Sequence, residues 1–125
     1  LIEYRGVFTQ DQIAEVYSKV DVIINPRKKS FLSDSVTPLK PLEAMGFEKL
    51  IMASNVGGMR EIIIDGKTGV LFQPDSVEAI KSAINNVLFS ENIQTIIDNA
   101  KLYVKQNRSW QSNAIKYKEI YHNLL

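Results

Sequence analysis

The sequence lacks the residue types that most metal and thiol chemistry requires. It contains no cysteine among 125 residues and only one histidine, His122. The absence of cysteine excludes disulfide bonds and thiolate catalysis, and it fits a reducing compartment, so we expect a cytoplasmic protein. No histidine or acidic cluster has the spacing of metal ligands, and we expect neither a metal nor a cofactor.

A strong charge imbalance and a long apolar run are also missing. The formal net charge is +1, which argues against a nucleic acid partner. No apolar run approaches the roughly 20 residues that span a bilayer. No signal peptide precedes Leu1, and the opening LIEYRGV begins directly in strand-like sequence. We therefore expect residues 1–125 to be one partial domain cut from a longer chain.

Short apolar runs alternate with helical patterns along the chain. The runs VIIN and LIMA are apolar on both faces, which is typical of parallel strands covered by helices. The alternation predicts an α/β fold: a Rossmann-like parallel sheet with helices on both faces and a helical C-terminal tail. The predicted strands are 2–5, 21–25, 49–53 and 70–72, and the predicted helices are 9–20, 41–46, 76–89, 92–106 and 110–124.

Two further features of this pattern concern the ends and connections of the predicted elements. Asp75 has N-cap spacing to Glu78, and residues 27–37 are polar and are predicted to be irregular. In open parallel sheets, ligands bind at the carboxyl ends of the strands. The candidate loops are therefore 6–8, 25–40 and 54–59.

The stretch SVTPLKPLEAMG, residues 35–46, places Lys40 and Glu43 at the start of an otherwise apolar helix, and its two prolines do not explain these charges. Pro38 favours an extended Thr37, and Pro41 suits the first turn of a helix. Lys40 then stands at the helix start, where a cation is slightly unfavourable unless an anion binds beside it. A diphosphate would supply that anion.

Glu43 lies one turn after Lys40. A carboxylate there can accept two hydroxyl hydrogen bonds, as a ribose diol offers. The structural alternative is that Glu43 only stabilises the first helical turn and that Lys40 is simply solvated. Spacing alone favours this alternative, because a single helix start with one lysine and one glutamate is a weak signal.

Several short blocks in a fixed order carry a more specific signal. They are DVIINP, TPLKPLEAMG, KLIMASNVGG, RE and DGKTGVLF-PDS, followed by three helices. This order resembles the second, donor-binding domain of retaining glycosyltransferases of the GT-B fold, family 4. The resemblance covers nearly the whole chain and implies a truncated half of a GT-B fold.

The resemblance implies roles for individual positions. Glu43 would bind the ribose of a nucleotide sugar, and the turn around Val7 would lie near the base. Gly57 and Gly58 are interpreted as backbone devices in a tight loop. The segment before Glu43 would line the phosphates and the donor sugar, through Val36, Thr37, Pro38, Leu39 and Lys40.

The sequence departs from the family pattern in two ways. Two acidic residues separated by seven others would place the first at Ser35, and the nearest acid is Asp34, one position earlier. We assign the sugar-binding role to Asp34. The family's basic pair for the diphosphate lies on strands that precede this sequence, and Arg27 is the candidate here that adds positive charge near the donor.

We therefore expect the donor-binding portion of a glycosyltransferase that uses a UDP- or GDP-linked sugar and retains anomeric configuration. Lys40 would neutralise the leaving diphosphate, and Asp34 would hold the sugar. A missing N-terminal domain would bind a sugar or lipid acceptor, so the isolated chain is expected to be inactive and to self-associate weakly. Membrane association of the full-length protein, a nucleotide-sugar epimerase of the same fold and a non-catalytic interaction module stay open as alternatives.

Overall fold

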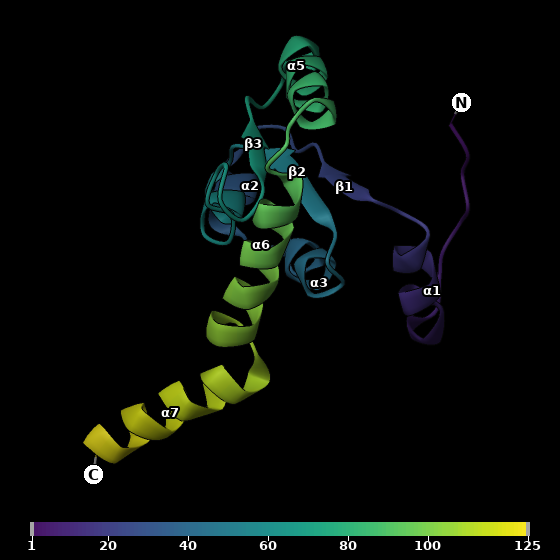
Figure 1. Cartoon of the computed structure of the whole chain (residues 1–125). Helices are drawn as coiled ribbons and strands as arrows, with labels where there is room; N and C mark the ends of the chain where they lie inside the picture. The colour runs from purple at the N-terminus through teal and green to yellow at the C-terminus, as the bar shows by residue number, and fades with distance from the viewer. Residues whose placement is uncertain (1, 125) are drawn as a thin grey trace.

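The computed structural model describes residues 2–124 and contains a three-stranded parallel sheet in the order β1-β2-β3 (Figure 1). The strands are β1 (Val22–Asn25), β2 (Leu50–Ser54) and β3 (Val70–Phe72). Val22 pairs with Leu50, and Met52 pairs with Val70. The predicted parallel sheet and its last three strands are confirmed.

The strand predicted at residues 2–5 is wrong. Residues 2–9 have no regular structure, and Ile2 and Tyr4 are exposed. A strand requires a neighbour to complete its ladder of hydrogen bonds, and β1 pairs only with β2 among the described residues. Strand propensity without a pairing partner therefore leaves this segment as extended chain.

The predicted helices are all present, with boundaries within a few residues of those expected. Thr9 opens the first one, and its N–H donates to Gln12 Oε1 at 3.0 Å, as the capping-box spacing predicts. In chain order the helices are the 3-10 helix η1 (Gln10–Gln12), α1 (Ile13–Ser18), α2 (Phe31–Ser35), α3 (Lys40–Gly46), α4 (Gly57–Arg60), α5 (Val77–Leu88), α6 (Ile93–Asn107) and α7 (Trp110–Leu124).

Two local predictions need correction. Residues 27–37 are not wholly irregular, because α2 lies within them and Ser30 Oγ caps it by accepting from Ser33 N at 3.1 Å. Ser76, not Asp75, caps α5, and its Oγ accepts from Ala79 N at 3.1 Å. Asp75 has a φ of 59° and accepts from Lys29 N instead, so its side chain faces another loop.

Strand β2 is the centre of the core, and its alternate residues face opposite layers. Ile51 and Ala53 pack with α3, α4 and α6 on one face of the sheet. Leu50 and Met52 pack with α5 and the start of α6 on the other face. All five residues of β2 are buried, which explains why the strand reads as a continuous apolar run. The sheet is therefore flanked by helices on both faces.

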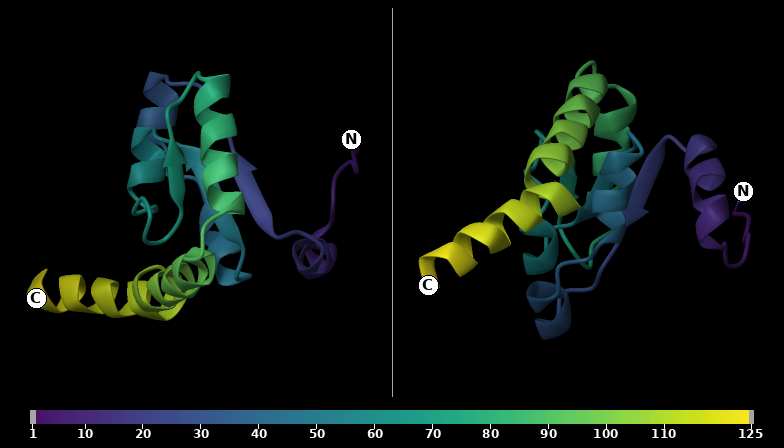
Figure 2. Two further views of the ribbon diagram at one scale, coloured as in Figure 1. Left: turned by 45° about the horizontal axis from the view of Figure 1, so that its top comes forward. Right: turned by 90° about the horizontal axis from the view of Figure 1, so that it is seen from below.

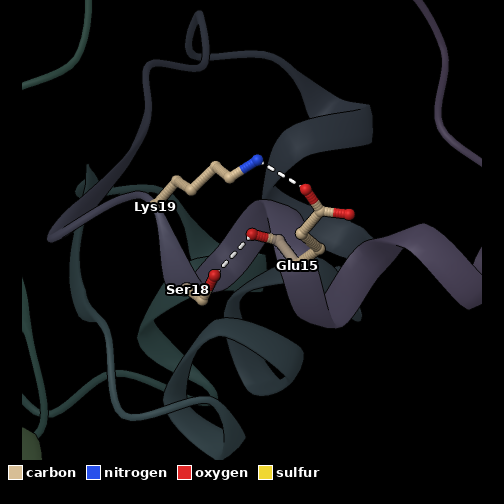
Figure 3. Close-up of polar contacts among 3 residues, drawn as sticks. All are labelled: Glu15, Ser18 and Lys19. Atoms are coloured by element: carbon tan, nitrogen blue, oxygen red, sulfur yellow. Dashed lines mark hydrogen bonds and ion pairs between the residues drawn. The ribbon is translucent and has the colours of Figure 1, made fainter.

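The two ends of the chain project from this core in opposite directions (Figures 1 and 2). Helix α1 lies to one side of the sheet and carries an exposed ion pair, Lys19 Nζ to Glu15 Oε1 at 2.5 Å. Figure 3 shows this pair beside Ser18, whose Oγ donates to Glu15 O at 2.7 Å. Such an exposed pair adds little stability.

Helix α7 extends away from the sheet and makes its main contacts with α6 (Figure 2). It buries none of its residues, and Trp110 at its start is 90% exposed. Among residues 2–124, none of the helices is long and apolar enough to cross a membrane.

Candidate functional site

The loops that follow the three strands are tied together at the carboxyl edge of the sheet. After β1, Arg27 N donates to Ser54 Oγ at the end of β2, at 2.8 Å. After β2, Asn55 N donates to Phe72 O at the end of β3, at 2.8 Å. In a parallel sheet this edge is where ligands bind, so these bonds give a candidate site a fixed floor.

Helix α3 points its N-terminus toward this edge. The helix packs on β2 and joins it through residues 47–49 alone, with Lys49 N donating to Ala44 O at 3.0 Å. A helix that enters its strand through so short a connection must run antiparallel to it. Pro41 occupies the first turn, as predicted, and is buried. Lys40 thus lies nearer than Glu43 to the carboxyl edge.

Lys40 and Glu43 are both exposed on α3. Lys40 forms no ion pair within residues 2–124. The helix has seven residues, or two turns, so we attribute the positive charge at its start mainly to the Lys40 ammonium rather than to a long helix dipole. Positive charge and a carboxylate are therefore one turn apart and open to solvent, as the sequence predicts.

Asp34 lies on α2 and is bound to the start of α4. Its Oδ1 accepts from Gly57 N at 2.6 Å, a short bond to a charged acceptor. A Cβ on Gly57 would lie 2.2 Å from Asp34 O, and one on Gly58 would lie 2.0 Å from Val36 O. Both glycines are therefore backbone devices, as predicted: they let α4 approach the backbone of residues 34–36.

The segment between Asp34 and Lys40 has one anchored side and one open side. Thr37 Oγ1 donates to Glu61 Oε2, so Glu61 helps to hold the loop in place. Pro38 is buried, whereas Leu39 is 78% exposed and Val36 is also exposed. The anchored residues fix the path of the loop, and the exposed ones present apolar surface beside Lys40.

The remaining predicted site residues lie on other segments. Val7 is 93% exposed, and neighbouring Phe8 borders a hollow of about 470 Å³ shared with α1 residues rather than with α3. Arg27 is half-buried and, with Lys28 and Asp75, borders a depression of about 500 Å³ beside α5. The structure thus gathers Asp34, Val36 and Thr37 against α4, leaves Val7 exposed to solvent and places Arg27 at the separate depression beside α5.

Tyr17 is a residue of the site that sequence reasoning missed. Its helical spacing from Ile13 and Val20 predicts a place on the apolar face of the first helix, but its Oη donates to Glu43 Oε2 at 3.5 Å. Its ring stacks on Phe47, with centroids 4.6 Å apart and planes 9° apart. Burial, helped by the charge of Glu43 and the bond to it, raises the pKa of Tyr17. No signal links residues 26 positions apart, so only the fold shows this contact.

Neither the ligand set of a metal nor a thiol is part of this arrangement. Among residues 2–124, no three histidine, cysteine, aspartate or glutamate side chains gather where they could hold a metal ion. The chemistry that the site itself offers is therefore hydrogen bonding and charge neutralisation by Lys40, Glu43 and Asp34.

Known proteins have similar sequences and folds. The sequence model of the family described as glycosyl transferases group 1 matches residues 4–116. The lipopolysaccharide 1,2-N-acetylglucosaminetransferase of Salmonella typhimurium is 31% identical over 115 residues, or 91% of this chain and 29% of that enzyme. Both similarities extend across the sheet, the α3 region and the α5–α6 helices.

Solved structures of glycosyltransferases have a fold similar to that of this chain. Sucrose-phosphate synthase from Thermosynechococcus elongatus superposes with a TM-score of 0.77 at 26% identity, covering 95% of this chain and 29% of that one. The Anabaena protein HepE, solved in complex with UDP-glucose, has a TM-score of 0.65 at 22% identity, covering 74% of this chain and 24% of that one.

These comparisons show to which family the chain belongs and how much of its relatives it covers. It spans less than a third of the length of each of these three proteins. Its parallel sheet and flanking helices match part of GT-B glycosyltransferases. The family match covers far more than half of the residues, and the chain therefore belongs to the glycosyl transferases group 1 family.

Proposed function

We propose that this chain is the donor-binding portion of a retaining, family 4 glycosyltransferase that takes its sugar from a nucleoside diphosphate. The whole protein would transfer that sugar to an acceptor held by a part of the protein outside residues 1–125. The chain's own contribution would be to bind the nucleotide, to hold the sugar and to neutralise the leaving diphosphate.

The observation that carries this proposal is the pair of open charges on α3. Lys40 and Glu43 are exposed, one turn apart, on a helix that starts toward the carboxyl edge of the sheet. A lysine ammonium pairs well with phosphate oxygens, and a carboxylate can accept both hydroxyls of a ribose. Their order along the helix suits a ligand whose diphosphate lies nearer the edge than its ribose.

Asp34 completes the proposed site. One of its oxygens is used by Gly57 N, and no hydrogen bond to Oδ2 is found within residues 2–124. We assign Oδ2 to a hydroxyl of the donor sugar. The bond to Gly57 would then fix the carboxylate in place before the donor arrives, which lowers the entropic cost of binding.

The donor class has support from relatives, although the particular sugar does not follow from it. The Salmonella relative is named for transfer of N-acetylglucosamine, and the Anabaena protein of the same fold was solved with UDP-glucose. We therefore propose a UDP- or GDP-linked sugar as donor and a sugar or lipid as acceptor.

The test uses the full-length protein and two variants. Glu43→Gln should weaken donor binding by about 1–3 kcal/mol, the cost of removing one partner of a hydrogen bond, without lowering Tm. Lys40→Ala should lower kcat more than it raises KM, because negative charge builds on the diphosphate as the sugar bond breaks. Calorimetric titration with a panel of nucleotide sugars and steady-state kinetics measure both effects.

Helix α5 offers matched controls. Glu78 is an exposed carboxylate in the first turn of α5, as Glu43 is in α3, and Lys81 lies one turn further on. Glu78→Gln and Lys81→Ala should leave the kinetics unchanged. If Glu43→Gln and Lys40→Ala also keep wild-type kinetics, α3 is only a stable helix start and the proposal fails. Product analysis separates transfer from epimerisation of the donor, and the anomeric configuration of the product tests retention.

A further inference from the structure

Tyr17 contacts the carboxylate that we assign to the ribose, and it comes from a different part of the fold. Tyr17 lies on α1 and Glu43 on α3, and the phenol oxygen is 3.5 Å from Glu43 Oε2. We infer that Tyr17 is a positioning residue that aims Glu43 at the ribose diol of the donor. This inference rests on the proposed function and adds a residue to it.

The ring stack fixes where the phenol hydroxyl lies. Glu43 and Phe47 are four residues apart, so they share one side of α3, and Phe47 N donates to Glu43 O at 3.0 Å. The Tyr17 ring lies flat on Phe47 with a centroid distance of 4.6 Å. Because the ring is held at one end of this side, its hydroxyl reaches the carboxylate at the other end.

A positioning group is useful here because Glu43 is otherwise unrestrained. An exposed glutamate has three rotatable bonds, and fixing them costs free energy at the moment a ligand binds. At 3.5 Å the contact is longer than the roughly 2.7 Å of a strong O–H···O bond, so it restrains Oε2 loosely. A carboxylate has about four lone-pair sites, which leaves acceptor capacity for a diol.

The chemistry of the phenol suits this task. Burial is the main cause of its raised pKa, and the nearby charge of Glu43 acts in the same direction. The phenol is therefore protonated near neutral pH and donates to the carboxylate instead of repelling it. A phenylalanine would keep the stack on Phe47 and lose only this donor.

The experiment compares ribose and deoxyribose recognition in the full-length protein. UDP, GDP and their 2′-deoxy forms are titrated into wild type, Tyr17→Phe, Glu43→Gln and the control Tyr121→Phe, whose tyrosine is exposed on α7. Tyr17→Phe should weaken ribonucleotide binding about three- to tenfold and reduce the preference for the ribose form, with Tm unchanged. A second variant, Phe47→Leu, keeps the hydroxyl but removes the stack and should reduce the preference in the same direction.

The ratio of ribonucleotide to deoxyribonucleotide affinity tests the positioning role of Tyr17 separately from the ribose-binding role of Glu43. If Glu43→Gln lowers the ratio while Tyr17→Phe leaves it at the wild-type value, the role of Tyr17 is refuted and the proposed function stands. If Glu43→Gln leaves the ratio unchanged, Glu43 does not read the diol, and both the ribose assignment and the role of Tyr17 are overturned.

Discussion

The contact between α4 and residues 34–36 has no room for a methyl group. Gly57→Ala should therefore disturb the proposed site indirectly, by displacing Asp34. The added Cβ would lie 2.2 Å from Asp34 O, whereas ordinary contact begins at 3.4 Å. The opposing atom belongs to the backbone, so no side chain can rotate away. The two segments must separate by about 1 Å, which is overpacking of a tight interface.

The expected cost follows from two effects. Overpacking of this kind costs about 1–3 kcal/mol. Separation also weakens the 2.6 Å bond from Gly57 N to Asp34 Oδ1, and bonds to charged groups contribute about 1.5–3 kcal/mol. If the bond is lost, the two costs sum to about 2.5–6 kcal/mol, which is a large share of the stability of a typical domain. At the roughly 2–4 °C per kcal/mol typical of chains longer than this one, we expect the Tm of the full-length protein to fall by about 5 °C or more.

Thermal melts of the full-length protein measure this effect, and donor kinetics should worsen as Asp34 moves. Gly46→Ala is the matched control, because Gly46 lies in α3 and a Cβ there meets no heavy atom within 4 Å. Alanine also favours the helix, so Gly46→Ala should keep or slightly raise Tm. A Gly57→Ala protein that melts within a degree of wild type would refute the close approach.

Three further predictions follow from other parts of the chain. Ser76→Ala removes the cap of α5 and should cost about 0.5–2 kcal/mol in a denaturant melt while leaving donor kinetics unchanged, since the Ser76 hydroxyl bonds to α5 and not to the residues of the proposed donor site. The raised pKa of Tyr17 means that the unfolded chain loses this proton first as pH rises, so wild type should lose more stability than Tyr17→Phe above about pH 10; equal losses in chemical melts at pH 9 and 11 would contradict this. The isolated 125-residue chain should turn over no nucleotide sugar in a product assay, because the acceptor site of the proposed enzyme would lie outside these residues; turnover above the level of its Glu43→Gln variant would show otherwise.

The buried centre of the fold is predictable because its signals are local. The run LIMA is apolar on both faces, and the structure divides it between two core layers. Pro41 indicates where α3 begins, and the glycine pair indicates a tight backbone contact. The structural consequences of these residues follow from their own type and their sequence neighbours, so no knowledge of distant partners is needed.

The failures concern residues whose state depends on a partner elsewhere. Residues 2–5 have strand propensity, but no strand lies beside them in the described chain. Asp75 has cap spacing, but its carboxylate serves Lys29 N, 46 positions away. Tyr17 reads as a core residue, and its contact with Glu43 arises only when α1 and α3 come together. Sequence spacing identifies a residue's nearest neighbours, not its neighbours in space.

The structure also bears on whether Lys40 and Glu43 only belong to a helix start or bind a ligand. Around the carboxyl edge, three acidic side chains accept hydrogen bonds that stabilise the loops. Asp34 accepts from Gly57 N, Glu61 accepts from Thr37, and Asp75 accepts from Lys29 N. Glu43 has one long contact, and Lys40 has no ion pair within residues 2–124. A lysine at a helix start is mildly unfavourable, and no ion pair within residues 2–124 offsets it. Because folding makes so little use of this pair, its position on α3 supports the proposed binding of an anion and a diol.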